Sequence, residues 1–119
     1  MERLAAIVIV TFALIFSSLA LSSCGGQSPT EVYRAYHAAA KKRDVETMMK
    51  YFTKARVKVV RADPSAYRYL VESENEYPGE TDGEVLDGNR AKVRIKDAHG
   101  QWFDQNFIWE DGSWKLGDW

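Results

Sequence analysis

Residues 90–96 constrain the fold more than any other part of the chain. Their letters, RAKVRIK, alternate between basic and apolar side chains without interruption. Successive side chains of a β-strand point to opposite faces, so this pattern predicts a strand with one buried and one solvated face. Three sequences that favour β-hairpin turns surround it: Asp87-Gly88-Asn89, Ala98-His99-Gly100 and Asp111-Gly112. The pattern predicts an antiparallel four-stranded meander with strands at 83–86, 90–97, 101–110 and 113–119.

Cross-strand pairing predicts the register of this sheet. Loops of three residues at 87–89 and 98–100, with a two-residue turn at 111–112, bring opposite charges together on one face and apolar groups on the other. The expected pairs are Glu84–Lys92, Asp104–Arg94, Phe103–Ile95, Trp109–Trp114 and Phe107–Leu116. The basic stripe is therefore the solvated face of the sheet. With 16 basic and 17 acidic residues, the chain also lacks the positive charge excess of a nucleic-acid-binding protein.

The residues before the sheet have helical periodicity. Ser28, Pro29 and Glu31 form a capping box with proline at the first helical position, which predicts a helix over 30–42. Apolar residues then repeat with helical spacing over 45–54 and predict a second helix.

The stretch between this second helix and the sheet is harder to interpret. Residues 54–62 fit either a helical continuation or a short strand, and Asp63-Pro64 begins a further helix. Residues 72–84 are rich in acids and predict a solvated loop. Helices that precede an antiparallel sheet predict an α+β domain.

The N-terminal segment has a different character. Residues 4–21 carry no charge, which is typical of a signal peptide or a membrane-spanning helix. Leu21-Ser22-Ser23-Cys24 closes this run and resembles the lipobox of bacterial lipoproteins. The resemblance implies cleavage before Cys24 and acylation of its thiol. Residues 1–23 are then a lipoprotein signal peptide, and residues 24–29 are the lipidated cysteine and a tether. The alternative is a free thiol just outside a membrane helix.

Acylation of Cys24 would determine where the protein acts. Each buried CH₂ of an acyl chain contributes about 0.8 kcal/mol, so several chains hold a domain firmly at a membrane. We therefore expect an extracytoplasmic, lipid-anchored protein of the bacterial cell envelope. Gly25 follows the cysteine, where Asp would resemble an inner-membrane retention signal, so the outer membrane is expected in a Gram-negative cell. Cys24 is the only cysteine, so no internal disulfide is expected.

Both ends of the mature chain resemble one family. SPTEVYRAYHAAAKKRDVETMMKYF and WEDGSWKLGDW are similar to the opening helices and the closing hairpin of small bacterial lipoproteins with a domain of unknown function. The resemblance covers most of residues 24–119 and implies a nuclear-transport-factor-two-like (cystatin-like) fold over 30–119. In that fold, N-terminal helices pack on a curved four-stranded meander, and the resulting cone encloses a cavity. The cavity is an active site in isomerase-like and cyclase-like members and a binding pocket in others, so the fold alone does not identify the function.

One set of side chains fits such a cavity. Aromatic walls with a few converging polar groups are typical of small-molecule pockets. Gln105 and Asp118 are expected to lie opposite each other, and a carboxylate under aromatic rings would have a raised pKa and could act as a base. The candidate pocket residues are Tyr33, Tyr36, His37, Phe103, Gln105, Phe107, Trp109, Trp114 and Asp118.

Three functions remain open at this stage. The first is a non-catalytic module that binds a small apolar ligand or another envelope protein. The second is an isomerase-like or cyclase-like enzyme with Asp118 as base and Tyr33 or Tyr36 as hydrogen-bond donor. The third is a structural role, including a homodimer, through the outward-facing residues Trp102, Ile108 and Trp119. No cofactor is expected, and no metal either, since a zinc site needs three or four ligands and the chain has two histidines.

Overall fold

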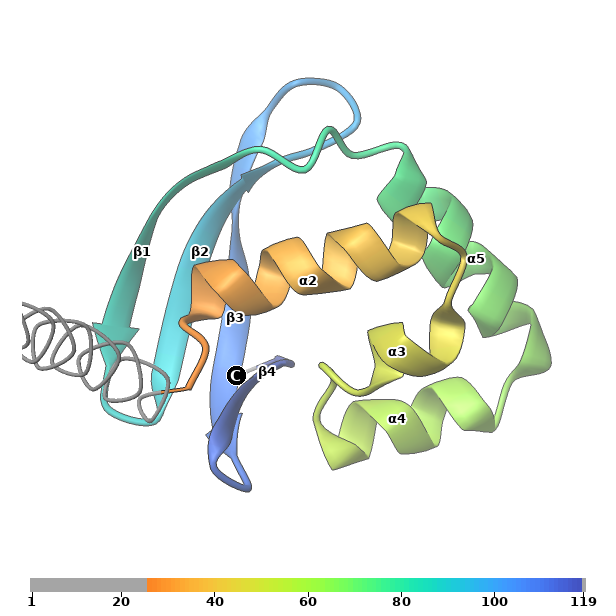
Figure 1. The fold of residues 1–119 in the computed structure, drawn as a ribbon, viewed down its shortest axis with the longest axis horizontal. Helices are drawn as coiled ribbons and strands as arrows, with labels where there is room; N and C mark the ends of the chain where they lie inside the picture. The colour runs from red at the N-terminus through yellow and green to blue at the C-terminus, as the bar shows by residue number, and fades with distance from the viewer. Residues whose placement is uncertain (1–25, 119) are drawn as a thin grey trace, which may run out of the picture.

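The computed structural model describes residues 26–118. The expected signal peptide, Cys24 and Trp119 lie outside the described residues. The elements in chain order are α2 (Pro29–Lys41), α3 (Val45–Met49), α4 (Lys54–Arg61), α5 (Pro64–Asn75), β1 (Thr81–Asp87), β2 (Arg90–Lys96), β3 (Trp102–Glu110) and β4 (Ser113–Leu116). The predicted α+β class is confirmed, because helices pack against one four-stranded antiparallel sheet (Figure 1). None of the helices within residues 26–118 has the length and apolar composition needed to cross a bilayer.

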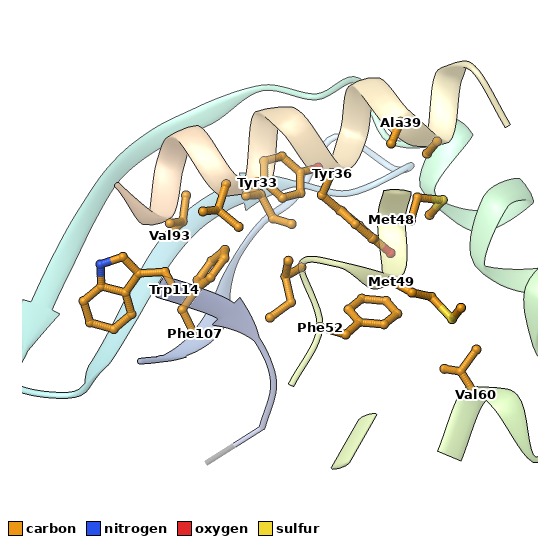
Figure 2. Close-up of a cluster of buried hydrophobic side chains, with 14 of the residues drawn as sticks. Tyr33, Tyr36, Ala39, Met48, Met49, Phe52, Val60, Val93, Phe107 and Trp114 are labelled. Carbon is orange, nitrogen blue, oxygen red and sulfur yellow. The ribbon is translucent and has the colours of Figure 1, made fainter. Parts of the chain in front are cut away.

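Helix α2 lies across the inner face of the sheet and forms as the capping box predicts. The Ser28 hydroxyl accepts a hydrogen bond from the Glu31 N–H at 3.1 Å, and the Glu31 carboxylate accepts the Ser28 N–H in return. The sheet curls around this helix (Figure 1). Tyr33 and Tyr36 project from α2 into the core (Figure 2). The Tyr36 ring packs on Phe52, and the Tyr33 hydroxyl points toward α5.

The sheet has the strand order β1-β2-β3-β4, and most of its predicted register is confirmed. The confirmed pairs are Asp104–Arg94, Phe103–Ile95, Trp109–Trp114 and Phe107–Leu116. The predicted pair Glu84–Lys92 is wrong, since Glu84 lies opposite Val93. The β1–β2 turn has two residues instead of three, and Gly88 takes its first position with a φ of 61°, which glycine adopts without strain.

This one-residue shift has a structural consequence. It turns Glu84 to the face that holds α2, where its carboxylate accepts the Thr30 N–H at 3.2 Å. The hydroxyl of Thr30 donates to the same oxygen of Glu84. The shift therefore connects the start of α2 to β1.

The second predicted helix is shorter than expected. The expected helix over 45–54 ends at Met49, and the chain then runs beside β4. Phe52 forms a parallel bridge with Leu116, the Leu116 N–H donates to the Tyr51 carbonyl at 2.6 Å, and the Thr53 N–H donates to the Leu116 carbonyl at 3.2 Å. This segment covers the free edge of β4, which otherwise presents unpaired backbone groups. The ambiguous stretch that follows is helical and forms α4.

The predicted acidic loop over 72–84 is wrong at both ends. Helix α5 continues to Asn75, and β1 begins at Thr81. The carboxylate of Glu72 accepts from Arg68 one helical turn earlier at 3.1 Å, which is a stabilising spacing on an exposed helix face. Glu74, in contrast, points toward α2 and is only 6% exposed. Two of the acidic residues that predicted a loop, Glu72 and Glu74, therefore belong to helix α5.

Candidate functional site

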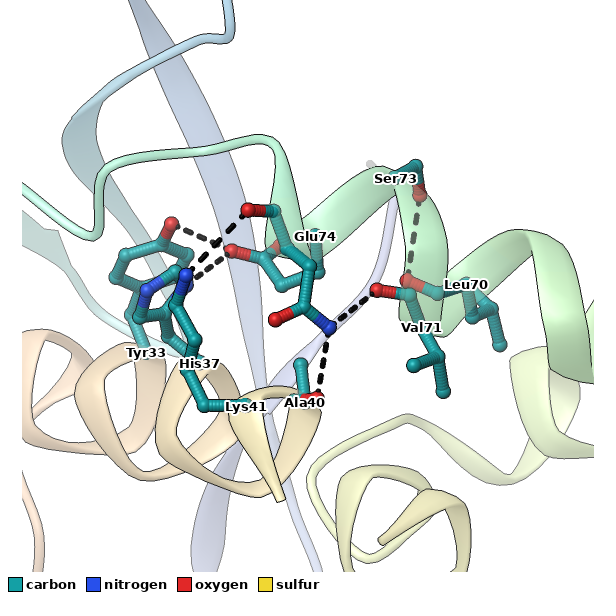
Figure 3. Close-up of polar contacts among 9 residues, drawn as sticks. Tyr33, His37, Ala40, Lys41, Leu70, Val71, Ser73 and Glu74 are labelled. Carbon is teal, nitrogen blue, oxygen red and sulfur yellow. Dashed lines mark hydrogen bonds and ion pairs between the residues drawn. The ribbon is translucent and has the colours of Figure 1, made fainter. Parts of the chain in front are cut away.

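A buried cluster of three polar side chains joins α2 to α5. Glu74 Oε2 accepts a hydrogen bond from the Tyr33 hydroxyl at 2.8 Å and lies 2.8 Å from His37 Nδ1 (Figure 3). Tyr33 and His37 are four residues apart on α2, so they share the face that meets α5. We call Glu74, Tyr33 and His37 the Glu74 cluster.

Burial controls the protonation of this cluster. It raises the pKa of the Glu74 carboxyl, and the hydrogen bonds from His37 and Tyr33 oppose that rise. Burial, together with the nearby Glu74 charge, also raises the pKa of the Tyr33 hydroxyl. The Tyr33 hydroxyl therefore stays protonated and donates a hydrogen bond to Glu74 Oε2. His37 Nδ1 is placed to donate a second hydrogen bond to the same oxygen.

The surroundings of the Glu74 cluster are closely packed. A Cβ atom on Gly79 would lie 2.6 Å from the His37 ring, so the chain between α5 and β1 closes over the imidazole. The Asn75 amide donates to the carbonyls of Ala40 and Val71, at 2.8 Å each (Figure 3). These contacts join the ends of α2 and α5. The geometry is that of a polar clamp between two helices, because packed groups rather than a cavity surround the carboxylate.

Several predicted pocket residues instead belong to the core. Tyr36, Phe107 and Trp114 are buried there (Figure 2). The Tyr36 ring packs on Phe52 with 5.4 Å between ring centroids, and burial raises the pKa of its hydroxyl. Side chains thus fill the space between α2 and the sheet.

The other two aromatic candidates, Phe103 and Trp109, lie near the two ends of β3. Phe103 packs edge-on against Tyr77, with 6.0 Å between ring centroids. Trp109 packs edge-on against Trp114 at 5.2 Å, and it remains 42% exposed. These two exposed rings lie on opposite sides of Phe107 along β3, so they do not converge on one pocket.

The predicted pairing of Gln105 with Asp118 is wrong. Strand β4 ends at Leu116 instead of continuing to 119, and Asp118 is exposed beyond it. The Gln105 amide donates to the Asn106 carbonyl at 3.1 Å. Gly117 still donates its N–H to the Asn106 carbonyl at 3.3 Å, and a Cβ atom there would lie 2.7 Å from Thr53. Close packing against the start of α4 therefore separates Asp118 from the inner face.

The outward-facing residues of the sheet also have contacts. Trp102 is partly buried, and Lys96 Nζ lies 5.1 Å from its ring centroid, which is cation–π geometry. Ile108 is partly buried and lines an open groove together with residues of α4 and α5. Trp119 lies outside the described residues. The expected exposed patch is thus reduced at both described positions.

An open groove lies between α4, α5 and the end of β3. Its volume is about 510 Å³. Val60, Leu70 and Ile108 contribute apolar lining, and Val59 and Tyr69, each 71% exposed, also line the groove. Its charged lining residues are Arg56, Glu110 and Asp118. We call this feature the α4–α5 groove.

Polar contacts hold α4 in place beside this groove. The Thr53 hydroxyl accepts the Arg56 N–H at 3.2 Å, and the Glu110 carboxylate accepts the Lys54 N–H at 2.8 Å. The Arg56 guanidinium lies over the Phe52 ring, 4.6 Å from its centroid. A second groove of about 470 Å³ lies on the other side of α4, where Lys54 forms an ion pair with Asp111 at 2.8 Å. Helix α4 is thus flanked by two open grooves.

One feature of the sequence points to Glu74, although the acidic composition of residues 72–84 obscures it. Glu74 follows Val71 by three residues on a helix, so the two share the buried face of α5. Within residues 26–118 no group of three or more His, Cys, Asp or Glu side chains is arranged to hold a metal ion. Comparisons with protein-family models, curated proteins and solved structures found no match.

Proposed function

We propose that the protein is a lipid-anchored component of the bacterial cell envelope and that its domain is a non-catalytic protein-interaction module. The lipobox resemblance at Cys24 supports the anchor. The α4–α5 groove supports the interaction, and it is the observation on which the proposal depends. We also propose a cone-like, nuclear-transport-factor-two-like fold, an assignment supported by the curl of the sheet around α2 (Figure 1).

The shape of the groove favours a protein partner over a small molecule. A small ligand is usually enclosed on most sides by its pocket. Val59 and Tyr69 are each 71% exposed, so a small molecule between them would remain largely in water. An apolar segment of another envelope protein would cover both side chains and reach Leu70 and Ile108 between them. Grooves between helices commonly bind apolar faces of partner segments.

The placement of the carboxylates favours binding over catalysis. Glu74 has a raised pKa, but its carboxyl group is bonded to Tyr33 and His37, and the chain at Gly79 covers the His37 ring. Asp118 is exposed in the α4–α5 groove, whereas the Tyr33 hydroxyl is bonded to Glu74. Asp118 and the Tyr33 hydroxyl therefore do not meet at one position where a substrate could contact both, as a general base and a hydrogen-bond donor must.

Site-specific photo-crosslinking in living source cells tests the interaction. A photoreactive side chain replaces Val59 or Tyr69 in the full-length protein, and a matched probe replaces Asp104, which is exposed on the outer face of β3. We expect one discrete crosslinked protein from the two groove positions and none from Asp104. Substitution Leu70→Asp should abolish the crosslink while the unfolding transition of the purified protein is retained.

Other outcomes would contradict the proposal. Equal crosslinking from Asp104 would mean that contact is unspecific. Absence of any crosslink, with extra mass below that of a protein in the native mass spectrum, would replace the protein partner with a small ligand. The same spectrum tests the anchor, because the mature chain should begin at Cys24 and carry acyl mass that Cys24→Ala removes.

A further inference from the structure

Two apolar side chains on one face of the sheet are exposed at its end, around the β1–β2 hairpin. Leu86 is 59% exposed and Trp109 42%, whereas Val85 lies opposite Lys92 and points to the other face of the sheet. Leu86 lies opposite Ala91 in the β1–β2 ladder. Trp109 lies beside the same hairpin, since its N–H donates to the Asn89 carbonyl at 2.8 Å. We call Leu86 and Trp109 the apolar sheet end.

The start of α2 is fixed on the same side of the domain. Thr30 bonds to Glu84 through its N–H and its hydroxyl. Glu84 precedes Leu86 by two residues on β1, so the two side chains share one face of the strand. The first turn of α2 and the end of β1 accordingly lie close together (Figure 1).

The length of the tether limits how far this side can lie from a lipid attached at Cys24. Pro29, the first residue of α2, follows Cys24 by five positions. A fully extended chain spans at most about 3.6 Å per residue, so the segment reaches about 18 Å or less. A lipid on Cys24 thus keeps the first turn of α2, and the apolar sheet end beside it, near the bilayer surface.

We propose that the apolar sheet end rests on the lipid bilayer that holds Cys24. This inference rests on the proposed acylation and adds a second, protein-mediated contact with the membrane. The exposed Leu86 side chain would leave water when it enters the boundary between headgroups and acyl chains. Trp109 is suited to that boundary, because its ring is apolar and its indole N–H can still reach polar groups.

The charges around the apolar sheet end favour apolar contact over attraction to anionic lipids. Asp87 and Arg90 face each other across the hairpin. Asp111, in the β3–β4 turn, forms an ion pair with Lys54 at 2.8 Å. Because both signs are present, the surface lacks the basic cluster typical of binding to anionic headgroups. We therefore expect the contact to depend little on the charge of the lipids.

This contact would set the orientation of the domain. Helix α2 has 13 residues, and at 1.5 Å per residue it spans about 20 Å. Helix α5 packs at the C-terminal end of α2, through the Glu74 cluster and Asn75. With the N-terminal end of α2 at the membrane, α5 is held away from the bilayer, on the side where a partner protein approaches.

Site-directed spin labelling of the full-length lipidated protein tests the contact. Cys24 is the only cysteine, so acylation leaves an introduced cysteine as the one reactive thiol. Labels are attached to the variants Leu86→Cys, Asp104→Cys and Val59→Cys in vesicles of phosphatidylethanolamine and phosphatidylglycerol. Asp104 and Val59 are exposed control positions on β3 and α4. Collisions with oxygen, which concentrates in lipid, are compared with collisions with a water-soluble nickel chelate.

We expect the label at Leu86 to lose nickel collisions and gain oxygen collisions relative to both controls. The same shift is expected in vesicles of phosphatidylcholine alone. Water-like collisions at all three positions, with acyl mass present on Cys24, would overturn the inference and leave the anchor intact. Absence of acyl mass would overturn the proposed anchor and this inference with it. Spin–spin broadening confined to Leu86 would overturn it in favour of a second copy of the chain at this surface.

Discussion

Helices α2 and α4 begin in the same way but have different roles in the fold. Each starts with a hydroxyl cap, from Ser28 in α2 and from Thr53 in α4. Helix α2 buries residues along its whole length against the sheet, α3 and α5, including Tyr33 and Tyr36. Helix α4 buries only Val60 and lies between two open grooves.

The difference lies in what each helix has to pack against. Large aromatic side chains on α2 join one buried core with residues of α3, α5 and the inner face of the sheet (Figure 2). The valines of α4 reach α5 and the segment at Phe52, and Val59 stays exposed. Helix signals in a sequence therefore predict that a helix forms, whereas the size of its apolar side chains predicts whether it belongs to the core. Helix α2 supports stability, whereas most of α4 remains exposed, as the proposed recognition role requires.

Substitution Phe107→Ala, in the core under α2, should have the largest effect. Removing a fully buried aromatic ring lowers the free energy of unfolding by about 3–5 kcal/mol. Val60→Ala truncates the one buried side chain of α4. It removes two methyl-sized groups and should cost about 1–2 kcal/mol. Denaturant unfolding of both purified variants measures the two values. Equal losses would show that α4 is as much a part of the core as α2.

The sequence predicted the sheet better than the helices that follow α2. Alternation along Arg90–Lys96 is readable because one face is buried, and it gave the register with β3. The β1 register depends on whether the turn has two or three residues, and the letters Asp87-Gly88-Asn89 allow both. The end of α3 depends on a bridge between Phe52 and Leu116, which are far apart in sequence and give no local signal.

The candidate site was predicted only in part. Tyr33 and His37 were identified as polar groups facing inward from α2, and they do lie at one cluster. Their partner is Glu74 on α5, whereas the sequence predicts Gln105 and Asp118 as the other polar groups of the site. A charged residue in an acid-rich segment has no local feature that marks it as buried, since burial depends on the donors that meet it.

Glu74→Ala should have the next largest effect. It leaves the Tyr33 hydroxyl and the His37 ring nitrogen without a partner in a buried site. Each unpaired buried group costs about 1–3 kcal/mol, so the free energy of unfolding should fall clearly. Glu74→Gln keeps a hydrogen-bonding side chain of the same shape and should lose much less at neutral pH. Equal losses from both variants would mean that the carboxylate charge, and not the hydrogen bonding, holds α2 and α5 together.

The pH dependence of the same pair of proteins tests the raised pKa of Glu74. Because burial raises this pKa in the folded state, the folded protein binds the proton more tightly than the unfolded chain. The wild-type protein should therefore gain stability relative to Glu74→Gln as the pH falls from neutral through the folded-state pKa. Unfolding free energies of both proteins, measured over that range, give the difference. A difference that moves in the opposite direction would mean that His37 and Tyr33 lower the pKa more than burial raises it.

Gly79→Ala tests how closely the chain packs over the Glu74 cluster. Gly79 has a φ of 80°, and a Cβ atom there would lie 2.6 Å from the His37 ring. Gly100 is a matched control, since its φ is 78° and its Cβ position is open. Backbone strain alone costs about 1–3 kcal/mol at either position. Gly79→Ala should lower the unfolding free energy more than Gly100→Ala does, and equal losses would show that His37 moves aside without cost.

Val59→Ser should have the smallest effect on stability and still impair binding. Val59 is 71% exposed on α4, so its substitution should change the free energy of unfolding by no more than about 0.5 kcal/mol. If α4 is a recognition surface, the same variant should weaken crosslinking from a photoreactive probe at Tyr69, because the partner loses apolar contact in the α4–α5 groove. Val85→Ser is the matched control, being 65% exposed on β1, outside that groove. It should leave the Tyr69 crosslink unchanged. A large loss of stability in Val59→Ser would place α4 with α2 as a structural helix, and an unchanged crosslink would move the recognition surface away from this groove.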